Sequence, residues 1–135
     1  MLIVHTEVKL DFSDVLMRPK RSNLSSRSQV SLTRTFKFRA SGQEYTGIPI
    51  MASNMDTVGG FEMAKALHKH SLFTTVHKHY SVEGWLNFAN ENEEVLSNLA
   101  ISQGIGEADQ EKVNAVISKV PQIGYICIDV ANGYS

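Results

Sequence analysis

The stretch SLFTTVHKHYSVEGWLNFANENEEVLSNLAIS, residues 71–102, has the pattern of two strands with a helix between them. Residues 71–78 are rich in β-branched and aromatic side chains, which is typical of a strand. Ser81 stands where a helix cap is expected, and apolar residues recur at helical spacing behind it, so we expect a helix over 81–96. Residues 97–102 form a second short apolar strand. Together they predict one strand–helix–strand unit.

The same alternation extends in both directions along the chain. The sequence predicts further strands over 46–53 and 122–130 and further helices over 61–70 and 107–120. Strands that alternate with helices across short loops form a parallel sheet. A (β/α)8 barrel needs eight strands in about 250 residues, whereas a flavodoxin-like sheet is complete with about five. Four strands after a long N-terminal segment therefore favour half a barrel.

The predicted fold class is α/β, as the N-terminal half of a (β/α)8 TIM barrel preceded by an extended basic arm. We expect the arm over residues 1–45 and the first four βα units over 46–135. The arm contains Pro, Ser and Asn and shows no clear periodicity, which is typical of an extended segment with turns.

Composition limits the class of protein. The chain has 135 residues, of which 42% are hydrophobic and 20% charged, as in one folded domain. Its net charge of −1 gives no overall attraction to nucleic acid or membrane. No apolar run reaches the roughly 20 residues that cross a bilayer, and the first residues lack a signal-peptide pattern. One cysteine excludes an internal disulfide. We expect a cytoplasmic protein without a membrane partner.

The basic residues are concentrated near the N-terminus. From Met17 to Arg39 there are seven basic residues and no acidic one, whereas Tyr80 to Glu111 holds seven acidic residues and no basic one. A basic segment can be a solvated surface, or it can bind nucleic acid or a phosphate-bearing small molecule. The segment has no aromatic residue before Phe36, which disfavours nucleic acid. A non-enzymatic nucleic-acid-binding domain stays as an alternative.

Polar residues follow every predicted strand. They are Ser53-Asn54-Met55-Asp56, His77-Lys78-His79, Ser102-Gln103-Gly104 and Asp129-Val130-Ala131-Asn132-Gly133. Parallel α/β proteins bind ligands at the carboxyl ends of their strands, although loops are polar in any case. Asp129 directly follows an apolar strand. Its carboxylate could bind ribose hydroxyls or orient a cation, or it could cap the loop.

Three weaker motifs are set aside. Gly104-Ile105-Gly106 is part of a dinucleotide-binding glycine pattern, but Asp109 occupies the position of the third glycine, which argues against a Rossmann fingerprint. Four histidines lie close in sequence, yet their spacing supplies no third ligand, so we expect no metal site. Cys127 lies inside a predicted strand, where a buried thiol is inert by default.

Four stretches resemble GMP reductase. They are DFSDVLMRPKRS (11–22), GIPIMASNMDTVGGFEMA (47–64), VHKHYSVEGW (76–85) and CIDVANGYS (127–135). The related IMP dehydrogenase shares the Met-Asp-Thr-Val sequence of residues 55–58, but a regulatory module usually interrupts its barrel after the second strand. Here residues 76–85 run straight into the next helix, and the resemblance favours the reductase. An IMP dehydrogenase that lacks its regulatory module is the alternative.

The resemblance implies a (β/α)8 barrel enzyme that reduces GMP to IMP and ammonia with NADPH. In that family a cysteine attacks C2 of the purine, ammonia leaves, and hydride then reaches C2. That cysteine, the GMP phosphate site and the acid/base pair lie beyond the matched region. We therefore expect the N-terminal half of a longer, homotetrameric enzyme, with no catalytic residue in these 135 residues and no activity of this chain alone.

The resemblance also implies which residues bind ligands. Lys78, Asp129, Val130 and Ala131 would contact NADPH, and Ser26 and Arg27 would reach a cofactor bound mainly by a neighbouring subunit. Asn54 and Met55 would lie under the purine of GMP or IMP. The basic arm then has a physical role, because cations recognise the 2′-phosphate of NADPH. Two positions depart from the family pattern: Ser53 replaces a usual alanine, and Ile105 replaces a usual small polar residue.

Overall fold

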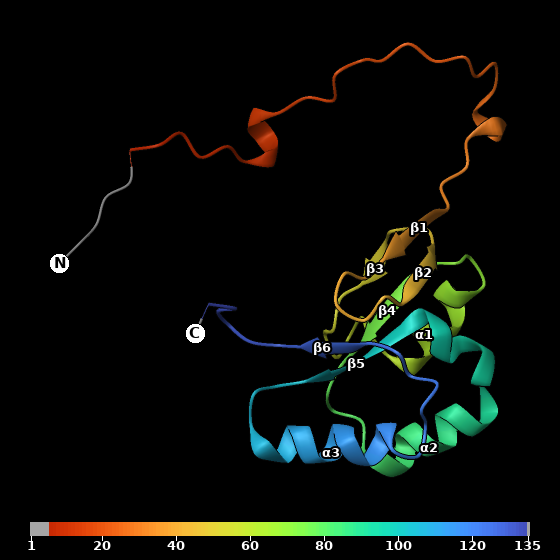
Figure 1. Ribbon diagram of the computed structural model, residues 1–135, viewed down its shortest axis with the longest axis vertical. Coiled ribbons are helices and arrows are strands. Elements are labelled where there is room, and N and C mark those ends of the chain that lie inside the picture. Colours follow the sequence, from red (N-terminus) through yellow and green to blue (C-terminus); the bar gives the residue numbers. More distant parts are fainter. Residues whose placement is uncertain (1–5, 135) are drawn as a thin grey trace. The chain divides into compact units, whose positions relative to one another are not determined.

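The structure, a computed structural model, describes residues 6–134 and divides into two units, Met1–Ser31 and Leu32–Ser135. The first unit contains two short 3-10 helices, η1 (Phe12–Asp14) and η2 (Arg27–Gln29) (Figure 1). Each of its described residues is exposed. Local hydrogen bonds shape its turns, as in the capping box that Asp11 and Asp14 form around η1. Residues 6–31 thus contain two short 3-10 helices and no strand.

The second unit begins with an antiparallel hairpin of β1 (Arg34–Lys37) and β2 (Glu44–Gly47). The turn between the strands contains Gly42 at φ 70°, a left-handed conformation that favours glycine. The sequence did not predict this hairpin and assigned most of it to the arm. β1 is exposed and β2 is partly buried, and neither strand has the apolar alternation by which strands are recognised.

The strand predicted for residues 46–53 was wrong, because the structure has two strands in this region. After β2 the chain turns at Ile48, whose carbonyl accepts a hydrogen bond from the Ile50 N–H at 2.8 Å. Pro49, between them, has no N–H to give to a ladder. The second strand, β3 (Met51–Ala52), then belongs to a different sheet.

That sheet has four parallel strands, β3, β4 (Phe73–Val76), β5 (Leu99–Gln103) and β6 (Ile126–Ile128). Their spatial order equals their order in the chain. A barrel adds strands in this way, whereas a doubly wound open sheet reverses its order at a switch point. The predicted parallel α/β fold is confirmed.

Three helices connect the strands: α1 (Phe61–His68), α2 (Val82–Glu91) and α3 (Glu107–Ile117). Ser81 caps α2, since its hydroxyl accepts a hydrogen bond from the Gly84 N–H at 3.0 Å. The helix predicted to reach residue 96 ends earlier and continues as a 3-10 helix, η3 (Glu93–Asn98). Figure 1 shows the helices on one side of the sheet.

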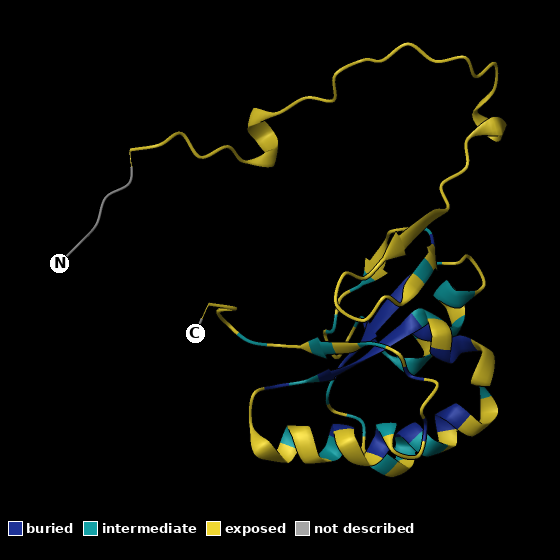
Figure 2. Ribbon diagram, in the orientation of Figure 1, coloured by how far each residue is buried: buried dark blue, intermediate teal, exposed yellow. Residues whose placement is uncertain are grey.

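The hydrophobic core lies between these helices and the sheet. Its most deeply buried apolar residues are each at most 2% exposed: Ala64, Val76, Trp85, Val95, Leu96, Leu99, Ile101, Val113 and Val116. Figure 2 shows the buried residues on the central strands and on the helix sides that face them. Burial of this apolar surface is the main stabilising term of the unit.

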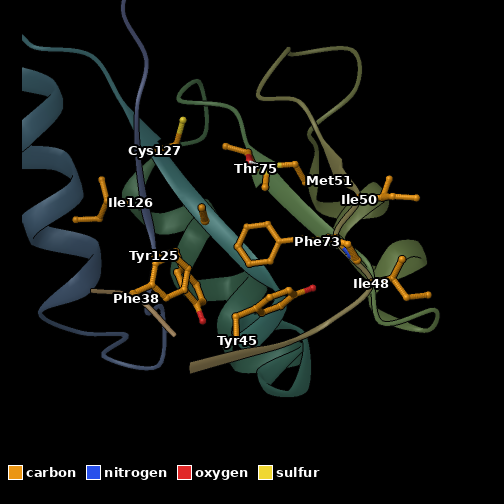
Figure 3. Close-up of a pocket in the computed structure, with 12 residues that line it drawn as sticks. Phe38, Tyr45, Ile48, Ile50, Met51, Phe73, Thr75, Tyr125, Ile126 and Cys127 are labelled. Carbon is orange, nitrogen blue, oxygen red and sulfur yellow. Dashed lines mark hydrogen bonds between the residues drawn. The ribbon is translucent and has the colours of Figure 1, made fainter. Parts of the chain in front are cut away.

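Aromatic side chains join the hairpin to the sheet. The ring centroids of Tyr45 on β2 and Phe73 on β4 are 5.3 Å apart, and Tyr125 lies 5.3 Å from Phe73 and 6.3 Å from Tyr45. Phe38 lies 5.5 Å from Tyr125. These rings border a pocket of about 330 Å³ that Cys127 and Thr75 also line (Figure 3).

Among the described residues, no helix has the length and apolar character that crossing a membrane requires.

Candidate functional site

The carboxyl end of β4 is fixed by the loop that follows β3. The His77 N–H donates to the Gly59 carbonyl at 2.9 Å. Gly59 packs so closely that a Cβ would overlap the carbonyl oxygens of Ser53 and Thr75. A glycine is therefore required here, and it lets the two loops meet at one edge of the sheet.

The residues on either side of Lys78 have structural partners. The His77 ring stacks on Tyr80 with centroids 4.5 Å apart, and its Nδ1 accepts a hydrogen bond from the His79 N–H at 3.2 Å. The Tyr80 hydroxyl accepts from the Phe61 N–H at 3.2 Å. Burial, and then the neighbouring His79, lower the pKa of His77. These contacts fix the backbone of the loop on both sides of Lys78.

Lys78 interacts with the loop and helix that follow β5. Its Nζ lies 3.6 Å from Asp109 Oδ2, and its side chain is 38% exposed. Its backbone carbonyl accepts a hydrogen bond from Lys112 Nζ. Both partners belong to α3, so the first turns of this helix hold the β4 loop from the side.

Asp109 is the centre of this group. Its Oδ2 accepts a hydrogen bond from the Gly104 N–H at 2.9 Å, and its Oδ1 lies 3.8 Å from Lys112 Nζ. The Gly104 hydrogen bond, and then the charges of Lys78 and Lys112, lower the pKa of Asp109. The carboxylate is therefore ionised at neutral pH. We call Lys78, Gly104, Asp109 and Lys112 the Asp109 cluster.

The structure does not pair Lys78 with Asp129. Asp129 follows β6, its side chain is exposed, and its N–H donates to the Gln103 carbonyl at 2.7 Å. No ion pair between described residues joins it to Lys78, whose partner is Asp109. Strand β5 separates the two strands that these residues follow. Val130 is half-buried and Ala131 exposed beyond the same strand.

Asn54 and Met55 follow β3 at the same edge of the sheet. Met55 is 58% exposed, and its carbonyl accepts hydrogen bonds from the N–H groups of Val58 and Gly59. Asn54 is half-buried. The loop is thus held by its own backbone, with both side chains near the carboxyl ends of the strands.

Ser26 and Arg27 belong to the first unit. Ser26 caps η2, where its hydroxyl accepts a hydrogen bond from the Ser28 N–H at 3.2 Å, and Arg27 is the first residue of η2. The cap fixes the local backbone of Arg27. Each unit is organised by its own contacts, so the predicted role of this pair at a neighbouring subunit's cofactor stays a prediction.

Sequence reasoning missed the role of Asp109. It considered this residue only as an interruption of a glycine pattern. The available signal was the i, i+3 spacing of Asp109 and Lys112 in a helix that starts directly after a strand-end Gly-X-Gly.

Among residues 6–134, no three His, Cys, Asp or Glu side chains are grouped to hold a metal ion.

Comparison with known proteins identifies related sequences. Residues 9–135 match the family model described as the IMP dehydrogenase / GMP reductase domain. The chain is 61% identical to GMP reductase 2 of Bos taurus, 59% to GMP reductase 2 of Homo sapiens and 55% to GMP reductase 1 of Homo sapiens, each over 132 residues. These matches cover 98% of this chain and 38% of each relative.

A solved structure supports the fold. The crystal structure of inosine 5′-monophosphate dehydrogenase from Legionella pneumophila matches with a TM-score of 0.60 at 22% identity. The match covers 92% of this chain and 36% of that chain. The arrangement of strands and helices is thus shared with part of that enzyme.

Proposed function

Because this chain belongs to the IMP dehydrogenase / GMP reductase family, we propose that it is the cofactor-binding part of a cytoplasmic, NADPH-dependent GMP reductase. Such an enzyme converts GMP to IMP and ammonia. The identity of 61% to a protein named GMP reductase 2, over 98% of the chain, supports this assignment. The chain spans 38% of the length of that relative, so the activity is proposed for a longer protein.

The surplus of positive charge in the Asp109 cluster is the observation that carries the cofactor assignment. Lys78 and Lys112 face one carboxylate, that of Asp109, so the cluster has a net charge of about +1. A Cβ on Gly104 would lie 3.4 Å from Lys78 Nζ and 2.6 Å from Asp109 Oδ2. The bare backbone at Gly104 therefore lets the Asp109 carboxylate approach beside the Lys78 ammonium, a cation that suits the phosphate-bearing part of a dinucleotide.

The residues of this chain would bind and orient rather than react. Lys78 would donate to an anionic group of NADPH, and Asp129 would accept from its ribose hydroxyls. Bound NADPH supplies the hydride that replaces the departing ammonia at C2 of the purine. Asn54 and Met55 would support the purine at the same edge of the sheet.

Cys127 is not the proposed nucleophile. It lies half-buried inside β6 and borders the aromatic pocket of Figure 3. The motif resemblance implies that the reactive cysteine lies elsewhere in the enzyme. We therefore propose that the 135-residue chain has no reductase activity by itself.

We also propose a homotetramer for the complete enzyme, in which Ser26 and Arg27 reach a cofactor of the adjacent subunit. The native mass of the complete enzyme tests the number of subunits.

The deciding experiment measures cofactor and substrate separately in the full-length enzyme. Lys78→Ala and Asp129→Ala should each weaken NADPH use by about ten- to a hundredfold, because each removes a hydrogen bond to a charged group. GMP affinity, measured without cofactor, should stay within about twofold. Lys65→Ala is the matched control, since Lys65 pairs with Glu62 on α1, away from the strand ends.

Normal NADPH kinetics in both variants, or a loss of GMP binding instead, would overturn the cofactor assignment. The same preparation distinguishes the alternatives. Oxidation of IMP with NAD and no reduction of GMP would indicate an IMP dehydrogenase. Salt-dependent binding of DNA or RNA through the basic arm would indicate a nucleic-acid-binding protein.

A further inference from the structure

Asp109 has a geometry that a helix cap alone does not require. It lies in the first turn of α3, and its two carboxylate oxygens have different tasks. Oδ2 accepts from the Gly104 N–H at 2.9 Å and faces Lys78 Nζ at 3.6 Å, while Oδ1 faces Lys112 Nζ at 3.8 Å. One side chain thus links the ends of β4 and β5 to α3.

The carboxylate is itself held in place. Its side chain is 27% exposed, and the Gly104 N–H fixes one oxygen from the β5 end. Lys112 approaches the other oxygen and also donates to the Lys78 backbone carbonyl. Lys78, by contrast, has a flexible four-carbon stem and is 38% exposed. Asp109 is therefore the fixed partner of this pair, and the Lys78 ammonium is the adjustable one.

The 3.6 Å separation leaves the Lys78 ammonium able to bind a second anion. An ammonium has three donors, and the cluster keeps its surplus positive charge when the pair with Asp109 is counted. An anionic ligand could therefore be bound by Lys78 without breaking its contact with Asp109. Because the carboxylate already restricts the conformations of the Lys78 side chain, less conformational entropy would be lost when the ligand binds.

We propose that Asp109 is a positioning residue, which holds the Lys78 ammonium beside Gly104 so that it meets an anionic group of NADPH. The proposal rests on the cofactor role of Lys78 proposed above. Lys112 supports the same arrangement by holding the Lys78 backbone. Asp109 itself makes no contact with the cofactor, and its effect passes through Lys78.

The test is equilibrium NADPH affinity of the full-length enzyme, measured by nucleotide fluorescence without GMP. Asp109→Asn keeps an oxygen for the Gly104 N–H but removes the charge that holds Lys78. It should raise the NADPH dissociation constant by about three- to tenfold, because the ammonium of Lys78 is then no longer held in place to form its hydrogen bond. Glu62→Gln, which breaks the i, i+3 pair with Lys65 on α1, is the matched control and should leave the NADPH dissociation constant unchanged.

A double-mutant cycle separates positioning from other roles. In a Lys78→Ala background, Asp109→Asn should have no further effect on NADPH affinity, because its action needs the ammonium. Gly104→Ala is an independent variant, since a Cβ there would lie 2.6 Å from Asp109 Oδ2 and displace the carboxylate. It should weaken NADPH binding to a similar extent, and it provides the test if Asp109→Asn fails to fold.

Unchanged or tighter NADPH binding in a folded Asp109→Asn enzyme would overturn the proposal. So would an equal effect of Asp109→Asn with and without Lys78, which would indicate a purely structural role. Failure of the cofactor assignment is a different result, because then Lys78→Ala itself would leave NADPH affinity unchanged.

Discussion

A central strand and an edge strand of the parallel sheet contain similar residues with very different burial. Ile101 on β5 is 1% exposed under the helices, whereas Ile126 and Ile128 on β6 are 51% and 63% exposed. All three are isoleucines on strands of one sheet. The difference is that α2 and α3 cover the central strands, while no helix among the described residues covers β6. An apolar sequence therefore shows only that a strand is suited to burial. The position of the strand in the sheet decides whether helices cover it.

Removal of Trp85 should have the largest effect, because it lies on the covered side. Trp85 is 1% exposed, and its ring contacts Phe61 with centroids 5.0 Å apart. Trp85→Ala leaves a large cavity and should lower the free energy of unfolding by about 3–5 kcal/mol. Urea denaturation followed by circular dichroism measures this loss. Trp85→Phe, which keeps a ring, should lose less, and equal losses would indicate that packing is not the cause.

Tyr125 should have an intermediate effect, because it lies on the other side of the sheet. Its ring contacts Phe38, Tyr45 and Phe73 and so joins the hairpin to the sheet. Tyr125→Ala should lower the free energy of unfolding by about 1–3 kcal/mol, since ring pairs add about 0.5–1.5 kcal/mol each. Hydrogen exchange of β1 and β2 should accelerate more than that of β5. Uniform acceleration would contradict a local role for the aromatic group.

His77 should make the stability of the strand ends depend on pH. Burial lowers its pKa below the ordinary value of 6.5, so the unfolded chain binds a proton more readily than the folded one. Stability from this group is full above pH 6.5 and is lost as the pH falls towards the lower folded pKa. His77→Gln should flatten the stability profile below pH 6.5 relative to the parent chain. An unchanged profile would assign the pH dependence to other groups.

The edge strand β6 should contribute least to the stability of the separate chain. Ile128→Lys replaces a 63% exposed side chain and should change the free energy of unfolding by no more than about 0.5 kcal/mol. It should instead reduce self-association, because a charged edge strand resists pairing with another chain. Sedimentation at several concentrations measures this effect. Ile105→Lys, at an 81% exposed loop position, is the control and should leave association unchanged.

The sequence predicted those parts of the fold that depend on local periodicity. Apolar spacing in Val82–Glu91 and Glu107–Ile117 predicted both helices, and the β-branched run before His77 predicted β4. The hairpin of β1 and β2 was not predicted, because its strands lack apolar alternation and Tyr45 packs on Phe73 and Tyr125, which lie far along the chain.

The candidate site could be predicted in part. Lys78 stands directly at a strand end, which the sequence shows. Its partner could not be read in the same way, because α3 brings Asp109 back to the sheet edge through a turn at Gly104. Strand ends can be found from a sequence, whereas the first turns of the helices between them reach the site only through three-dimensional packing.

The order of the strands has a consequence for how this unit can form during synthesis. After β3, the strands β4, β5 and β6 each pair with the strand made just before them. A growing chain can therefore extend the sheet one βα unit at a time as it leaves the ribosome, without waiting for a distant segment. The first strand, β3, lies beside the hairpin in sequence, so the aromatic contacts of Tyr45 with Phe73 can seed the sheet before its later strands exist.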